Sequence, residues 1–100
     1  MDSYIVKVVG ERDTEITDNL KDAFKIAQEK LLKHNLKHSY ARITWTYGLF
    51  EKTELTVNIG ADYPRPRDAI GHGYPFIAMQ NGSYMGKLNL DGTFVKEVRA

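Results

Sequence analysis

One stretch of this 100-residue chain repeats its apolar side chains at the period of an α-helix, and this stretch limits what the rest can fold into. Its apolar residues recur at spacings of three and four, at Leu20, Ala23, Phe24, Ala27 and Leu31. Such a stripe predicts an amphipathic helix with one buried face. We place the helix at residues 17–34, with Thr17 as the N-cap and Asn35 in the left-handed conformation after the last turn.

A different period follows the helix. Apolar and polar residues alternate over 41–49 and again over 55–59. This alternation is typical of strands that turn one face to the core, and two such strands close together predict a hairpin. Residues 3–9 are rich in β-branched side chains and predict another strand, which ends near Gly10.

Two dipeptides divide the C-terminal quarter of the chain into three expected strands. Asn81-Gly82 and Asp91-Gly92 each stand between runs of β-prone residues. They predict tight hairpins, because both positions of such a dipeptide tolerate positive φ. Gly86 lies inside the middle strand, where a glycine indicates a bulge or a side chain packed over the backbone.

Together these elements predict an α+β fold in the order β-α-β-β-loop-β-β-β. We expect a mainly antiparallel sheet of five to six strands, covered on one face by the single amphipathic helix. One hundred residues suffice for one hydrophobic core, so residues 1–100 are expected to form a single domain.

The composition excludes several classes of protein. The hydrophobic fraction of 42% is too high for a disordered tail. The net charge of +1 is too small for a protein that binds nucleic acid through a strongly basic surface. The chain has no cysteine, and therefore no disulfide framework or thiolate chemistry. It shows neither a signal-peptide pattern nor a long apolar run, so we expect a cytoplasmic protein with no membrane contact.

The stretch 60–75 contains all three prolines and is the one long irregular segment expected. Long loops in compact domains are often functional. Five of its residues are predicted to bind a partner or ligand: Tyr63, Arg65, Arg67, His72 and Tyr74. Arginines form bidentate hydrogen bonds with carboxylates or phosphates, and tyrosines stack on aromatic rings or bases. His72 stands between two glycines, which allow its backbone many conformations. In the alternative interpretation, the arginines pair with Asp62 and Asp68 and only hold the loop in place.

Signals for catalysis and metal binding are weak. His34 and His38 are four residues apart, which suits a zinc site only if the helix continues through both. The serines lack the setting of an activated nucleophile. We therefore predict no catalytic residue, no metal site and no cofactor, and we favour a non-enzymatic role without excluding an enzyme.

The leading hypothesis is a small binding module that engages a macromolecular partner, most readily a protein. It would use the 60–75 loop and an exposed sheet face, where Tyr40, Phe50 and Met85 are expected to form an apolar spot. Size and architecture resemble small accessory proteins of phages and other mobile elements, many of which inhibit a host protein. The alternative is a protein that binds or hydrolyses an anionic metabolite, such as a nucleotide, through the 60–75 loop.

Two further hypotheses concern partners. Residues 20–42 carry six lysines or arginines against two carboxylates, but these cations are spread around the helix. Nucleic acid is therefore a less favoured partner. The edge strands of the sheet suggest a homodimer formed across a two-fold axis.

Overall fold

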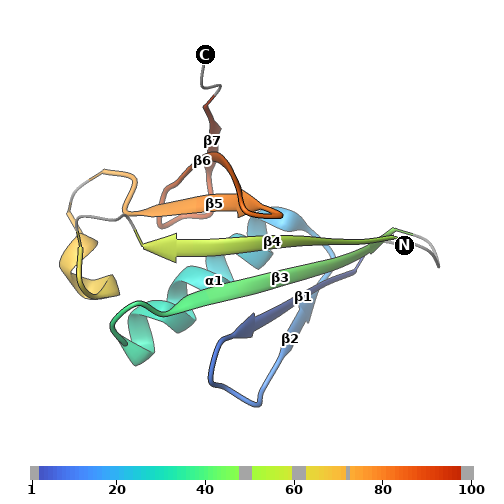
Figure 1. Cartoon of the computed structure of the whole chain (residues 1–100), viewed down its shortest axis with the longest axis horizontal. Coiled ribbons are helices and arrows are strands. Elements are labelled where there is room, and N and C mark those ends of the chain that lie inside the picture. Colours follow the sequence, from blue (N-terminus) through green and yellow to red (C-terminus); the bar gives the residue numbers. More distant parts are fainter. Residues whose placement is uncertain (1–2, 48–50, 60–62, 72, 98–100) are drawn as a thin grey trace.

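A computed structural model describes residues 3–47, 51–59, 63–71 and 73–97 of the chain. Within these ranges a single helix, α1 (Leu20–His34), packs on one face of an antiparallel sheet (Figure 1). The α+β class predicted from the sequence is confirmed, with seven strands instead of five to six. The sheet order is β2-β1-β3-β4-β5-β6-β7, and the strands are β1 (Ser3–Val8), β2 (Glu15–Thr17), β3 (Tyr40–Tyr47), β4 (Glu51–Ile59), β5 (Phe76–Gln80), β6 (Ser83–Leu88) and β7 (Phe94–Lys96).

The additional strand is β2, at one edge of the sheet. It pairs with β1 through three residues, with Ile16 opposite Ile5 and Thr17 opposite Tyr4. A strand of three residues is too short to show an alternating pattern, and its charged surroundings favour a loop in sequence-based reasoning. Its existence depends on the partner strand, which a local pattern does not reveal.

The strand β2 also explains why the predicted helix start is wrong. Thr17 ends β2, and Asn19 is the N-cap of α1: its side-chain Oδ1 accepts a hydrogen bond of 2.8 Å from the backbone N–H of Asp22. Asparagine caps a helix at least as well as threonine, so pairing of Thr17 with β1 decides between them. The predicted end is confirmed, because Asn35 has φ of +50° and donates its N–H to the Leu31 carbonyl.

The core lies between α1 and the sheet. The helix buries the predicted stripe, in which Phe24 and Leu31 are the largest side chains. The strands bury every second residue against it, as period two requires. The strand residues in this core are Val6, Val8, Ala41, Ile43, Leu55, Val57, Phe76, Ala78 and Leu88.

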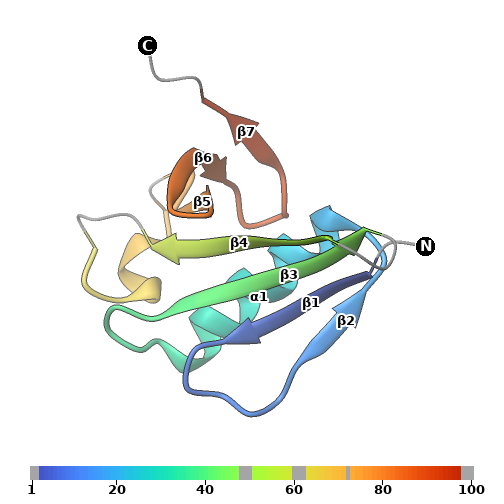
Figure 2. The same cartoon turned by 45° about the vertical axis from the view of Figure 1, so that its right-hand side comes forward.

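The far half of the sheet turns away from the near half. Figure 2 shows β1 to β4 running together beside α1, whereas β7 projects away from them. The turn between β5 and β6 is the predicted tight one, because Asn81 and Gly82 have φ of +49° and +83°. A register shift beside Ala78 places Gly86 opposite it, while Met79 faces Tyr84. Met85 is thus the extra residue of a bulge beside Gly86, and Phe94 packs closely over Gly86, so both alternatives predicted for this glycine are present.

The turn between β6 and β7 differs from the prediction. Only Gly92 of the Asp91-Gly92 pair has positive φ, at +89°. Asn89 donates its N–H to the Thr93 carbonyl and accepts from Gly92, which makes the loop longer than a two-residue turn. The Thr93 hydroxyl and backbone N–H bond the Asp91 carboxylate, and these bonds hold its pKa below the usual value.

The length and hydropathy of the helices can be compared with those of a membrane span. In the described ranges, no helix combines the length and the apolar character that crossing a membrane requires.

Candidate functional site

The 60–75 segment is partly packed against the rest of the molecule. It contains a short 3-10 helix, Pro66–Ala69, which places Pro66 and Ala69 in buried positions. Pro75 is also buried. Pro66 and Pro75 therefore attach this segment to the body of the fold, whereas Pro64 is exposed.

Arg67 binds the end of α1. Its Nε donates to the Leu32 carbonyl at 3.0 Å, and one Nη donates to the Lys33 carbonyl at 3.3 Å. Its backbone N–H donates to the side chain of Asn35 at 2.9 Å. The last carbonyls of a helix have no partner within the helix and lie at its negative end, so a guanidinium satisfies them well. Arg67 thus holds the segment in place through helix carbonyls, and among the described residues no ion pair joins it to Asp68.

The other predicted binding residues differ in how exposed they are. Arg65 is exposed, and Tyr74 is 43% exposed. Tyr63 is half-buried and has an interaction partner. His72 and Asp62 lie outside the described residues, so their predicted roles stay predictions.

We expect Arg67→Ala to lower the free energy of unfolding by about 1–2 kcal/mol, because the helix carbonyls lose a charged donor. Arg65→Ala is the matched control and should change stability by less than about 0.5 kcal/mol. Urea unfolding followed by circular dichroism measures both. Equal stabilities of the two variants would show that the Arg67 contacts contribute nothing.

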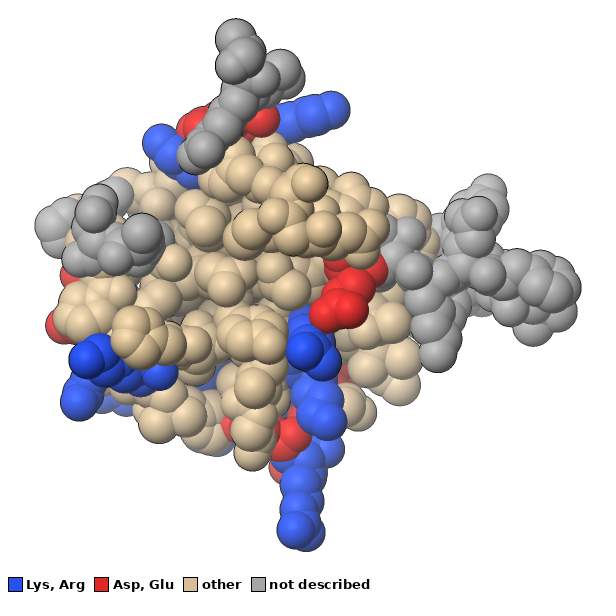
Figure 3. Space-filling view, in the orientation of Figure 1, with Lys and Arg blue, Asp and Glu red and all other residues tan. Residues whose placement is uncertain are grey.

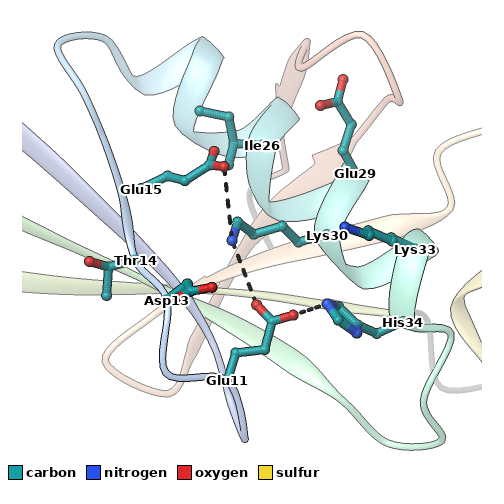
Figure 4. Close-up of a pocket in the computed structure, with 9 residues that line it drawn as sticks. All are labelled: Glu11, Asp13, Thr14, Glu15, Ile26, Glu29, Lys30, Lys33 and His34. Carbon is teal, nitrogen blue, oxygen red and sulfur yellow. Dashed lines mark ion pairs between the residues drawn. The ribbon is translucent and has the colours of Figure 1, made fainter.

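A pocket of about 490 Å³ lies between α1 and the connection from β1 to β2 (Figure 4). At its centre the Lys30 amine lies 3.6 Å from Glu11 Oε2 and 4.0 Å from Glu15 Oε1. Glu11 Oε1 contacts His34 Nε2. These pairs tie the connection to the helix. The lining residues are Glu11, Asp13, Thr14, Glu15, Ile26, Glu29, Lys30, Lys33 and His34.

The chemistry available in this pocket is limited. Its one half-buried amine is already paired, because Lys30 lies between two glutamates (Figure 4), and the lining as a whole carries four carboxylates against two lysines. The described residues contain no group of three His, Asp or Glu side chains placed to hold a metal ion. The helix ends at His34, and His38 follows with φ of +60°, so the two do not share a helical face as a zinc pair would require. We interpret the contacts that line this pocket as structural, because they attach the connection between β1 and β2 to α1.

The face of the sheet away from α1 is a third candidate, which we call the open face. The residues that alternate with the core positions belong to it. By register, its described strand residues are Ser3, Ile5, Lys7, Ile16, Tyr40, Arg42, Thr44, Glu54, Thr56, Asn58, Ile77, Met79, Tyr84, Lys87 and Val95. Figure 1 views this face, with the strands in front of α1.

Charge is unevenly distributed on the open face. Figure 3 shows a broad region without charged side chains, and a line of basic and acidic side chains beside it. One charged group is the Arg42–Glu54 pair, with 3.1 Å between Nε and Oε1. Another is Lys87 with Glu97, at 3.2 Å. Between them, by register, lie half-buried Ile77 and Met79.

Of the three residues predicted to form an apolar spot on this face, the structure places one there. Tyr40 belongs to the open face, and Phe50 lies outside the described residues. Met85 was wrongly predicted to lie there, because the bulge beside Gly86 turns it toward the core. Ile77 and Met79 were not among the predicted residues, although the alternation over Phe76–Gln80 indicates that they share this face.

Comparison of the chain with protein-family models, with curated proteins and with solved structures finds no match. A function for this chain is therefore inferred from the geometry of these three regions.

Proposed function

We propose that this chain is a small, non-enzymatic binding module that engages a protein partner through the open face of its sheet. The observation that carries the proposal is the uncharged middle of this face, where Ile77 and Met79 lie half-buried between two ion-paired groups. Protein interfaces commonly join an apolar centre to a polar rim. A module of this kind acts by covering a surface of its partner, as inhibitors and accessory proteins of mobile elements do.

The alternative function, binding of an anionic metabolite by the 60–75 segment, has less support. Arg67 directs two of its five guanidinium donors to helix carbonyls, which holds its side chain at the end of α1. Beside Arg67, the described loop residues with exposed side chains that can donate to an anion are Arg65 and Tyr74, and neither has a contact that directs it toward Arg67. Such separate donors provide much less than the converging groups of a typical small-molecule site.

The proposal predicts a specific pattern in binding to peptides selected from a random library displayed on phage. Ile77→Lys should weaken binding of the selected peptides at least about tenfold, because it places a charge in the apolar centre of the face. Calorimetry or surface plasmon resonance measures the change. Amide spectra of the variant check that the fold is intact.

Ile70→Lys is the matched control, since Ile70 is 49% exposed and lies in the 60–75 segment. It should leave the affinity for the selected peptides unchanged. Loss of binding in Ile70→Lys alone would assign the activity to the loop. Unchanged binding in both variants would exclude the open face as the site.

A further inference from the structure

Two cations face each other across the open face. Lys7 of β1 and Arg42 of β3 are direct partners in the antiparallel register, and both are exposed. Side chains directly opposite each other have Cβ atoms about 5 Å apart, and like charges at that distance destabilise the pair. The Glu54 carboxylate offsets part of this repulsion from the far side of Arg42, and an anion held between Lys7 and Arg42 would offset the rest.

The Arg42 side chain is already oriented. Its Nε pairs with Glu54 at 3.1 Å, and one Nη donates to the Tyr40 hydroxyl at 3.2 Å. The guanidinium carbon lies 5.7 Å from the centre of the Tyr40 ring. These contacts restrict the side chain before any ligand arrives, and a restricted side chain loses less entropy on binding.

A hollow of about 140 Å³ opens beside these two cations. Lys7 and Arg42 line it together with Val9 and Gly10. The lining thus supplies two positive charges, an apolar side chain and a glycine with open space above it. Pockets for nucleotides and drug-sized ligands are usually about 300 Å³ or larger, so this hollow suits a single carboxylate group.

The hollow is the end of a row that crosses the sheet. Lys7, Arg42, Thr56 and Met79 are successive partners in register from β1 to β5. Neighbouring strands are about 4.8 Å apart, so the midpoint between Lys7 and Arg42 is roughly 12 Å from Met79. Side chains four residues apart on one face of an extended segment are roughly 13 Å apart.

We propose, building on the proposed function, that the Lys7–Arg42 hollow binds an aspartate or glutamate side chain of the protein partner. The partner segment is extended and crosses the strands, and it places an apolar side chain four residues from the acid over Met79. A polyanion matches this surface poorly, because the rest of the row is Thr56 and Met79 and carries no charge.

Two synthetic peptides test the proposal: Thr-Asp-Thr-Val-Thr-Leu-Thr, and the same peptide with Asn in place of Asp. Titration of isotope-labelled protein with the Asp peptide should shift the amide signals of Lys7, Gly10 and Arg42 together with that of Met79. The Asn peptide should bind about tenfold more weakly, which is the usual worth of one charge-assisted contact. Lys7→Gln should remove the difference between the two peptides, and Lys96→Gln, at an exposed position on β7, should preserve it.

The possible failures are distinguishable. Equal binding of both peptides at Met79 would overturn the carboxylate site and leave the open face as a binding surface. Signals that move only with an oligothymidine strand would overturn it in favour of nucleic acid. If no signal of the open face moves with either peptide, the carboxylate site is wrong, and the library selection then decides the proposed function separately.

Discussion

Replacing Phe24 with alanine is expected to lower the free energy of unfolding by about 3–5 kcal/mol. Phe24 is 1% exposed and lies at the centre of the buried face of α1. Alanine favours the helix more than phenylalanine does, so the loss comes from packing and not from helix propensity. Domains of this size have stabilities of about 5–15 kcal/mol, and the variant would therefore be only marginally folded.

The ring that Phe24 contacts predicts which part of the fold the substitution should destabilise most. Its ring centre lies 5.9 Å from that of Phe94 on β7, so the substitution also loosens the contact between α1 and the last hairpin. Hydrogen exchange of the β7 amides should accelerate more than that of β1. Urea unfolding gives the total effect.

Ile70→Ala provides the control for Phe24→Ala. Ile70 is exposed, and its truncation should change stability by less than about 0.5 kcal/mol. If Phe24→Ala is no less stable than this control, α1 is not packed on the sheet as described. The open face lies on the other side of the sheet, so the folded fraction of Phe24→Ala should still bind the selected peptides.

Local signals predicted the parts of the fold that local interactions determine. The end of α1 depends on Asn35, and the turn between β5 and β6 depends on Asn81-Gly82. Each of these residues adopts positive φ by its own chemistry, whatever lies elsewhere in the chain. Both features were therefore legible in the sequence.

Features that depend on residues distant in the sequence could not be predicted from local patterns. Thr17 and Asn19 are both good caps, and only the pairing of Thr17 with Tyr4 selects between them. The same holds for the candidate site. Lys7 and Arg42 lie opposite each other because of the register between β1 and β3, and their spacing along the chain does not predict this.

The second large effect is expected for Gly86→Ala, which should destabilise the protein by about 2–4 kcal/mol. A Cβ at Gly86 would lie 2.1 Å from the Val95 carbonyl oxygen and 2.9 Å from the ring of Phe94. The first of these atoms belongs to the backbone of β7, which cannot move aside without breaking its pairing with β6. The variant should therefore lose β7 from the sheet, and loss of its amide protection in hydrogen exchange would report this.

Gly82→Ala separates crowding from backbone conformation. Gly82 has φ of +83°, and a Cβ there meets nothing within 4 Å, so alanine suffers only the conformational penalty of about 1–2 kcal/mol. Gly86→Ala should exceed it, and only Gly86→Ala should release β7. A Gly86→Ala protein as stable as the parent would mean that β7 is not held over Gly86. Of the two features that the sequence predicted for Gly86, a bulge or a close approach of the chain, only the bulge would then remain. The contact between Phe94 and Phe24 would then require a different placement of β7.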